Sequence, residues 1–287
     1  MKNLKLVSAW FSLLLLTACS NKDLPKYNHL DSLRVLALLI DTPEVNPGDA
    51  VVITPWISDT NGAGRALTYT AAACLDPGIS YGATPTCEGS ASKVSIASGS
   101  AIAGLNAGNL YTGAVNTLAV TTPVTGIIFA AHRPIELYNG VAYIVTYTVS
   151  ASDGTKVDSF RRIIVSDPSK VTKNANPTVT QILANGIEIA AYPGTAVNLQ
   201  AVYGAGSAES YVAKKDDGSI GGLGTDVGLT ESLTTTWFIS SGATDFIRTI
   251  GDGITLFTPD SSTPAVSRFI AVTHDNRGGV GLKDYTL

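Results

Sequence analysis

The sequence has few charged residues: aspartate, glutamate, lysine and arginine make up 15% of its 287 positions. The net charge of −4 provides no cationic excess for the phosphates of a nucleic acid, so we expect no nucleic-acid partner. Glycine, by contrast, occurs 28 times, and serine, threonine, valine and alanine recur throughout. This composition argues against a helix bundle and predicts an all-β fold.

Histidine occurs only three times, which leaves little material for acid–base or metal chemistry. His29 falls in a polar N-terminal stretch, and His132 lies beside Arg133 in a predicted loop. His274 precedes Asp275, but consecutive residues of a strand point to opposite faces, so adjacency does not pair them. Neither a Walker-type phosphate loop nor a His-Glu-x-x-His motif is present. We therefore predict a protein that is not an enzyme and that uses no metal and no cofactor.

Two weaker patterns were weighed against this prediction. Ser90 and Lys93 match Ser-x-x-Lys, but they lie in a predicted loop, where the chemistry needs a helix, and no Lys-Thr-Gly follows. Asp216, Asp217 and Asp226 could offer oxygen ligands to calcium, but they lack the Asp-x-Asp-x-Asp-Gly spacing. Chance and a solvated turn are the favoured explanations of the two patterns.

The apolar run at residues 6–16 is too short to span a bilayer, which needs about 20 residues. Because Lys2 and Lys5 precede it, the segment is typical of a secretory signal peptide. Leu16-Thr17-Ala18-Cys19 resembles a bacterial lipobox. This resemblance implies that residues 1–18 are removed and that Cys19 carries the acyl chains, palmitate among them. It places the protein in the cell envelope, anchored in the outer membrane of a Gram-negative bacterium. The alternative is a secreted protein whose signal peptide happens to contain a cysteine.

Residues 1–18 hold two lysines and no acidic residue, so their removal would leave 269 residues and a charge near −6. That length suits two domains of ordinary size. Residues 19–31 are polar and contain a proline, so we expect a lipidated flexible tether that reaches at most about 40 Å.

If Cys19 is acylated, Cys74 and Cys87 remain as a pair. In an oxidising compartment an even pair predicts a disulfide. Two free thiols, or half of a metal site, are the alternatives, although no Cys-x-x-Cys motif or nearby histidine supports a metal.

Short β-rich segments separated by turn residues recur along the whole chain. In the first part they are residues 34–40, 51–57, 66–74, 111–120, 126–131, 141–150 and 156–165, and Pro55 suggests an edge strand or a bulge. In the second part they are residues 179–184, 196–203, 233–240, 253–258, 265–273 and 280–286. Asp153-Gly154 between two such runs predicts a hairpin.

An internal repeat indicates two domains of the same kind. Pro47-Gly48-Asp49-Ala50-Val51 matches Pro193-Gly194-Thr195-Ala196-Val197, and a β-rich segment precedes each copy. Between the copies, the polar and proline-bounded residues 168–177 predict a linker. We therefore expect a first domain at 32–167 and a second at 178–287, each a Greek-key β-sandwich.

These motifs resemble the tandem Ig-like domains of bacterial surface lipoproteins. The resemblance rests on Pro-Gly-[Asp/Thr]-Ala-Val before the second strand, Trp237-Phe-Ile-Ser-Ser-Gly242, and the last hairpin from Phe269 to Val280. It implies two tandem Ig-like Greek-key sandwiches and says almost nothing about function, since this fold has many roles.

The predicted function is a non-enzymatic, membrane-tethered rod that contacts another protein or an extracellular polymer. The alternative is a carbohydrate-binding module for peptidoglycan or exopolysaccharide, because tyrosine and tryptophan rings stack on sugars. Trp56 and Trp237 are expected in the core; the candidate tyrosines are Tyr69, Tyr81, Tyr111, Tyr138, Tyr203 and Tyr211. The glycine-rich residues 204–228 are expected to be a binding loop, an added hairpin or a floppy insertion without a partner.

Overall fold

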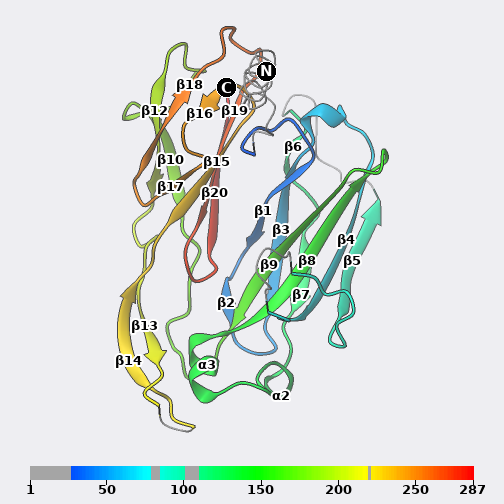
Figure 1. The fold of residues 1–287 in the computed structure, drawn as a ribbon, viewed down its shortest axis with the longest axis vertical. Helices are drawn as coiled ribbons and strands as arrows, with labels where there is room; N and C mark the ends of the chain where they lie inside the picture. The colour runs from blue at the N-terminus through cyan, green and yellow to red at the C-terminus, as the bar shows by residue number, and fades with distance from the viewer. Residues whose placement is uncertain (1–26, 79–84, 101–109, 219–220) are drawn as a thin grey trace, which may run out of the picture.

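The fold is almost entirely β-sheet in the computed structural model, which describes residues 27–78, 85–100, 110–218 and 221–287. Figure 1 shows two groups of strands that lie side by side, with a separate hairpin extending from the second. The predicted signal peptide, Cys19 and Tyr81 lie outside the described residues.

The first group is a sandwich of two sheets. One sheet has the order β1-β3-β6, with β7 also paired to β3, and the other has the order β2-β9-β8-β4-β5. Their bounds are β1 Arg34–Ile40, β2 Glu44–Val45, β3 Ala50–Ser58, β4 Leu67–Leu75, β5 Val94–Ser100, β6 Thr112–Ala114, β7 Leu118–Thr121, β8 Val141–Ala151 and β9 Lys156–Val165.

The second group is also a sandwich of two sheets, ordered β11-β10-β12-β18-β16 and β17-β15-β19-β20. Their bounds are β10 Val179–Ala184, β11 Ile187–Glu188, β12 Val197–Tyr203, β15 Thr234–Ile239, β16 Ala243–Thr244, β17 Arg248–Ile250, β18 Ile254–Thr258, β19 Arg268–His274 and β20 Val280–Thr286.

The strand order of both sandwiches is that of an Ig-like fold, as the sequence predicts. In the second sandwich, β10, β12, β18 and β16 share one sheet and correspond to the first, second, fifth and fourth strands of an Ig domain. The strands β15, β19 and β20 share the other sheet and correspond to the third, sixth and seventh. The short strands β11 and β17 are additions to these sheets. Trp237 on the third long strand is fully buried, at the position where Ig domains keep a tryptophan. In the first sandwich, β2 runs parallel to β9 and extends the second sheet. The two matching Pro-Gly segments lead into β3 and β12, the second strand of each sandwich.

The two sandwiches are packed against each other instead of being linked end to end. Residues alternate along β19, so that Phe269 and Ala271 are buried in the core of the second sandwich, while Ile270 and Val272 are buried in the core of the first. On the first sandwich, β1 contacts β20 and has no exposed residue. The expected rod is therefore wrong in shape. The continuous apolar run of β1 reflects burial on both faces of the strand.

Residues 126–131, predicted as a strand, instead begin within a short helix, α2 (Thr125–Ile128). Ile128 and Phe129 are buried while Val124 and Ile127 are exposed, which is a helical and not an alternating pattern. A second helix, α3 (Pro134–Asn139), starts with proline, and Glu136 accepts a hydrogen bond from the Arg133 amide.

Pro55 lies inside β3, a central strand, and not at the predicted edge. It falls between the part of β3 that pairs with β7, which ends at Ile53, and the part that pairs with β6, which begins at Trp56. The partner strand is thus interrupted where proline has no N–H to donate.

The expected flexible tether ends earlier than residue 31. Asn28 and Leu30 are buried, and the backbone of residues 28–30 exchanges hydrogen bonds with Ile239 at 2.9 Å in both directions. The correction follows from Leu30, whose apolar side chain is 1% exposed within the first core. Residues 168–177 do connect the two sandwiches, but Lys170 and Asn174 in this linker are buried.

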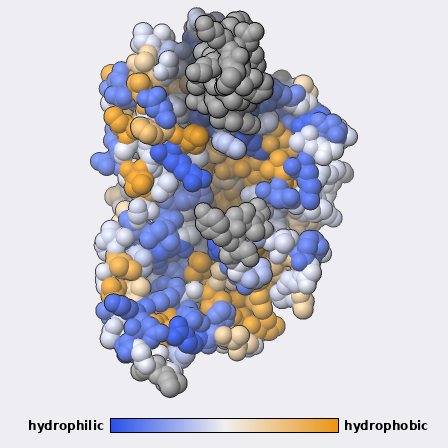
Figure 2. Space-filling model, viewed as in Figure 1, coloured by the Kyte–Doolittle hydropathy of each residue, from blue (hydrophilic) through white to orange (hydrophobic). Residues whose placement is uncertain are grey.

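The long stretch at residues 204–228 contains an added hairpin, which is one of the alternatives considered for it. Its strands are β13 (Ser210–Lys215) and β14 (Thr225–Thr230). The hairpin reaches back to the first sandwich, where the Asn139 side chain bonds both the N–H and the C=O of Lys214, at 2.7 and 2.8 Å. Figure 2 shows hydrophilic residues interspersed with hydrophobic ones, with hydrophilic side chains gathered at the end where this hairpin lies.

Candidate functional site

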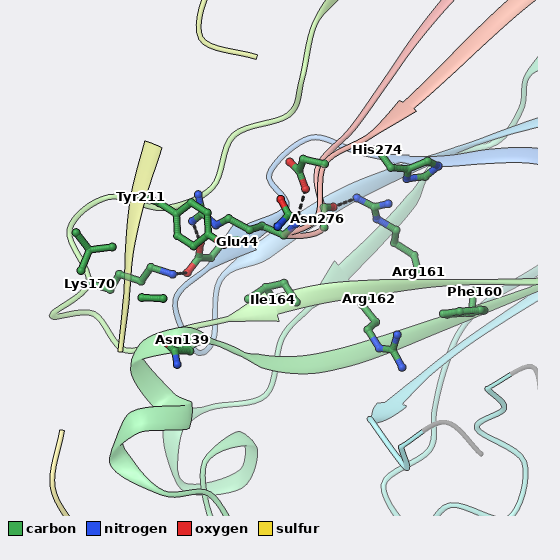
Figure 3. A pocket seen from close by; sticks show the side chains of 15 residues that line it. Glu44, Asn139, Phe160, Arg161, Arg162, Ile164, Lys170, Tyr211, His274 and Asn276 are labelled. Atoms are coloured by element: carbon green, nitrogen blue, oxygen red, sulfur yellow. Dashed lines mark hydrogen bonds and ion pairs between the residues drawn. The ribbon is translucent and has the colours of Figure 1, made fainter. Parts of the chain in front are cut away.

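A cavity of about 580 Å³ lies where the two sandwiches and the hairpin meet. Its walls come from β9, from β13 and from the turn between β19 and β20 (Figure 3). This turn lies against β9, because the Arg161 side chain donates a hydrogen bond to the Gly278 carbonyl and Gly278 lies beside the Ile164 side chain. Segments more than a hundred residues apart therefore build the cavity together.

Glu44 is the centre of a buried charge network beside the cavity. Its side chain is 1% exposed, and its two oxygens lie 2.6 Å from the Lys170 ammonium and 2.9 Å from the Arg277 guanidinium. The backbone N–H of Asn174 donates a third bond at 2.8 Å. Burial alone would raise the pKa of Glu44, but the bonds from Lys170 and Ser166 hold it below its ordinary value. The network thus ties β2, the linker and the last turn together.

Arg277 is matched by acidic residues on three sides. Besides Glu44 it lies 3.0 Å from Glu231 and 3.4 Å from Glu209, and its guanidinium stacks 4.2 Å from the centre of the Tyr211 ring. The planar guanidinium carries several N–H donors that can bond to different partners at the same time. The compact ammonium group of a lysine could not make this set of contacts.

Asp275 shapes the turn between β19 and β20. Its Oδ1 accepts the backbone N–H groups of Arg277 and Gly279 at 2.8 and 2.7 Å, and its Oδ2 accepts the Asn174 amide at 3.1 Å. The carboxylate is therefore engaged by its own turn and by the linker.

Arg161 differs from the other buried cations of the site. Its side chain is 8% exposed and donates to the carbonyl of Gly278, yet no carboxylate of the described residues lies within ion-pair distance of it. Its Nε is buried and has no hydrogen-bond partner there. Burial lowers the pKa of Arg161 to about 10, and the nearby charge of Asp275 opposes that shift only in part. In Figure 3, Arg161 projects toward the turn, whereas Arg162 points away from it.

His274 lines the same cavity from the end of β19. Although the residue is exposed toward the cavity, the protein atoms packed around its ring and the neighbouring Arg161 charge lower its pKa to about 4. The imidazole is therefore neutral at pH 7. Among the described residues that line the cavity there is no serine, threonine or cysteine, and the hydroxyl present is the phenol of Tyr211, whose ring lies under Arg277.

The predicted disulfide is confirmed. Cys74 and Cys87 are bonded, with their Cα atoms 5.6 Å apart, and both are buried against Ile144. The bond fastens the loop before β5 to the end of β4 in the first sandwich.

The other candidate residues are spread over the molecule. The ring of His132 lies 3.2 Å from the Glu136 carboxylate beside α3. The backbone of His29 forms an isolated parallel β-bridge with that of Ile239. The Lys93 ammonium lies 2.6 Å from the Glu88 carboxylate. Ser90 instead bonds Ser92. No Ser–Lys catalytic pair is therefore formed.

Two of the acidic residues of the hairpin, Asp216 and Asp226, form ion pairs within the protein. Asp216 lies 2.7 Å from Arg133, and Asp226 pairs with Lys214. Within the described residues, no group of three histidine, cysteine, aspartate or glutamate side chains could hold a metal ion.

The candidate aromatic side chains that the structure describes have separate surroundings and do not form a strip on one sheet face. Tyr69 stacks on Tyr147, Tyr138 lies under Lys170 and Lys214, and Tyr211 lies under Arg277. Tyr203 is partly buried and bonds Thr235. Of the tryptophans expected in the core, Trp237 is fully buried and Trp56 is partly buried.

The sequence analysis missed the cavity residues Arg161, Glu44 and Arg277. One indication was available: Arg161 shares a face of β9 with Ile163 and Val165, both fully buried, so a charge falls at an inward position. A charged residue in a core pattern is a sign of a special site. No pattern linked Glu44 to Arg277, which are 233 residues apart.

The sequence matches no protein-family model and no curated protein. Among solved structures, fibronectin(III)-like modules of Clostridium thermocellum CbhA align over 88% of this chain and 92% of theirs, at 10% identity and a TM-score of 0.24. The Yersinia pseudotuberculosis adhesin InvE aligns over 89% of this chain and 60% of its own, at 13% identity and a TM-score of 0.22. Red sea bream transglutaminase aligns over 88% and 30%, at 10% identity and a TM-score of 0.26. At such scores the Ig-like assignment rests on sheet topology alone. Among the described residues, no helix is long and apolar enough to cross a membrane.

Proposed function

We propose that the protein is a lipid-anchored, non-enzymatic scaffold of the bacterial cell envelope that contacts another protein or an extracellular polymer. The observation that carries the proposal is β19, whose side chains are buried alternately in both cores. A strand shared in this way fixes the two sandwiches relative to each other. Surfaces on both can then be presented to a partner in one constant geometry, as binding surfaces held on a rigid scaffold require.

The anchor in this proposal is Cys19 in its lipobox-like context. Acylation there would place the protein on a membrane, with Tyr27 only eight residues from the lipid. Ser20 is compatible with the outer membrane.

The proposed contact surface includes the hairpin. A second cavity of about 570 Å³ lies between β13, β14 and the linker, with Val171 and Leu229 among its lining residues. Val171 is 92% exposed and Leu229 is 42% exposed. Exposed apolar side chains beside a concavity are typical of interaction sites.

Photo-crosslinking in intact cells tests the proposal. A photoreactive residue at Val171 or Leu229 should give a discrete adduct in the envelope fraction, whereas one at the exposed Thr155, in the turn between β8 and β9, should not. A clickable fatty acid should label the wild type and not Cys19→Ala, and the adduct should disappear in that variant. Acyl label on Cys19→Ala would refute the anchor, and identical adducts at all three positions would refute the contact surface.

A polysaccharide partner is the second candidate. The outer face of β4, β5 and β8 forms a hollow of about 870 Å³ lined by hydroxyl-bearing residues such as Thr70, Thr146 and Thr148. Hydroxyl groups can both donate to and accept from sugars. Co-sedimentation with purified peptidoglycan tests this second candidate. The polysaccharide partner is favoured if the wild-type protein co-sediments and the double variant Thr146→Val, Thr148→Val co-sediments less.

A further inference from the structure

We propose that the cavity between the sandwiches binds a small monocarboxylate with an apolar or aromatic body, and that the guanidinium of Arg161 receives its carboxylate group. This site is independent of the proposed scaffold function, and its ligand is distinct from the envelope partner.

The first argument is the charge that the protein leaves uncompensated. Arg161 is one of four cationic side chains around the cavity, with Arg162, Lys170 and Arg277. Arg162 lies 2.7 Å from Asp76, while Lys170 and Arg277 are paired through Glu44. Within the described residues, the buried Arg161 is the one of these four whose partner is a neutral carbonyl and not a carboxylate. A buried cation without a counter-ion is costly, so an anionic ligand would stabilise this arrangement.

The second argument concerns geometry. A guanidinium offers a planar fork of donors that matches two carboxylate oxygens. One edge of the Arg161 group bonds the Gly278 carbonyl, which fixes its orientation. Its Nε remains without a partner in the described part of the chain. The group is thus held in place with donor capacity to spare.

The third argument selects a singly charged ligand. Glu44 and Asp275 also line the cavity, and the side-chain oxygens of both accept hydrogen bonds from several donors. A doubly charged phosphate would meet these two negative charges, whereas a monocarboxylate carries half its charge.

The walls indicate the rest of the ligand. Phe160, Ile164, Val212 and Ala213 give the cavity an apolar side, and its volume of about 580 Å³ lies in the range of small-molecule sites. A ligand whose carboxylate binds Arg161, and whose ring or short alkyl chain packs on these apolar residues, would contact both the charged and the apolar side of the cavity.

The test is binding of 3-phenylpropionate to the purified full mature chain in detergent, by calorimetry and by ligand-observed NMR. We expect a Kd of about 1 mM or tighter, and at least tenfold weaker binding of 3-phenylpropionamide and of inorganic phosphate. Arg161→Gln should weaken 3-phenylpropionate binding at least tenfold. Lys156→Gln, which removes one positive charge from an exposed residue of the same strand outside the cavity, should change it less than twofold.

A second variant covers the case in which Arg161→Gln fails to fold. Asn276 is exposed, lines the cavity and accepts the Ser232 N–H through Oδ1 at 3.1 Å, a bond that Asn276→Asp preserves. The added negative charge should weaken carboxylate binding about tenfold without loss of structure. No binding up to 50 mM, equal binding of the amide, or phosphate binding as tight as that of the acid would overturn the proposal. So would unchanged affinity in a folded Arg161→Gln protein.

Discussion

Phe269 and Ile270 are consecutive residues of β19, yet their side chains are fully buried in two different hydrophobic cores. The sheet that contains them is therefore an inner layer of the whole molecule and not the outer wall of one sandwich. A second contact supports this arrangement, because the buried Arg268 of the same strand donates to the Thr112 carbonyl of the first sandwich at 3.1 Å.

The shared strand predicts that both sandwiches unfold together. Ile270→Ala should lower the free energy of unfolding by about 2–5 kcal/mol, since it removes a fully buried side chain. Denaturation can be followed separately in each sandwich by the fluorescence of Trp56 or Trp237, with the other tryptophan replaced by phenylalanine. Coincident curves are expected. Ile254→Ala, at a residue that is half exposed on β18, should cost at most about 0.5 kcal/mol. Two separate transitions would contradict the coupling.

The buried network around Glu44 predicts a large effect of one neutral substitution. Glu44→Gln leaves Lys170 and Arg277 without their shared carboxylate and should cost about 3–5 kcal/mol. Asp158→Asn, which breaks an exposed pair 3.5 Å from Lys156, should cost at most about 1 kcal/mol. Urea denaturation at pH 7 measures both; equal effects would mean that the buried network is unimportant for stability.

The lowered pKa of Glu44 adds a pH dependence. Its contribution should be complete above the unfolded value of 4.5 and should be lost as the pH falls through the lower native pKa. The difference in stability between wild type and Glu44→Gln should therefore shrink below pH 4.5. A difference that stays constant down to pH 2 would exclude this linkage.

His274 predicts a further loss of stability on acidification, in a higher pH range than the loss caused by Glu44. Its native pKa of about 4 lies below the unfolded value of 6.5, so between these values the unfolded chain binds the additional proton. Stability should decline as the pH falls from about 6.5 toward 4, and His274→Gln should remove part of the decline. The access of the ring to the cavity limits the size of this effect. A decline of the same size in His274→Gln as in the wild type would contradict this assignment.

The disulfide predicts a measurable stabilisation of the first sandwich. Cys74 and Cys87 are 13 residues apart, and closing a loop of this size contributes about 3 kcal/mol in the unfolded-state model. Replacing both by serine should lower the unfolding free energy by about that amount, and the wild type should show no reactive thiol at these positions after denaturation without reductant. Two free thiols would refute the bond.

The sequence by itself determined the class of fold and most of the strands. Alternating and β-branched segments form strands because a half-covered sheet needs such residues, and the repeated Pro-Gly turn marks the second strand of each sandwich. The cysteine pair was predictable because only two cysteines remained after Cys19 was assigned. These are local properties, or properties of counting, and they need no knowledge of distant contacts.

Only the tertiary structure decided how the sandwiches meet and what lies between them. From the sequence, the apolar run of β1 could equally be covered by its own sandwich alone. The continuous apolar pattern of β19 indicates that both faces of the strand are buried, but it does not indicate which elements cover them. The packing of the two sandwiches brings the Arg277 guanidinium within 2.9 Å of the Glu44 carboxylate. The turn between β19 and β20 covers Arg161 and accepts its hydrogen bond through the Gly278 carbonyl. Charge pairing across such sequence separations leaves no periodic pattern, because it depends on the position of whole sheets. The cavity, unlike the strands, is therefore a property of the assembled fold.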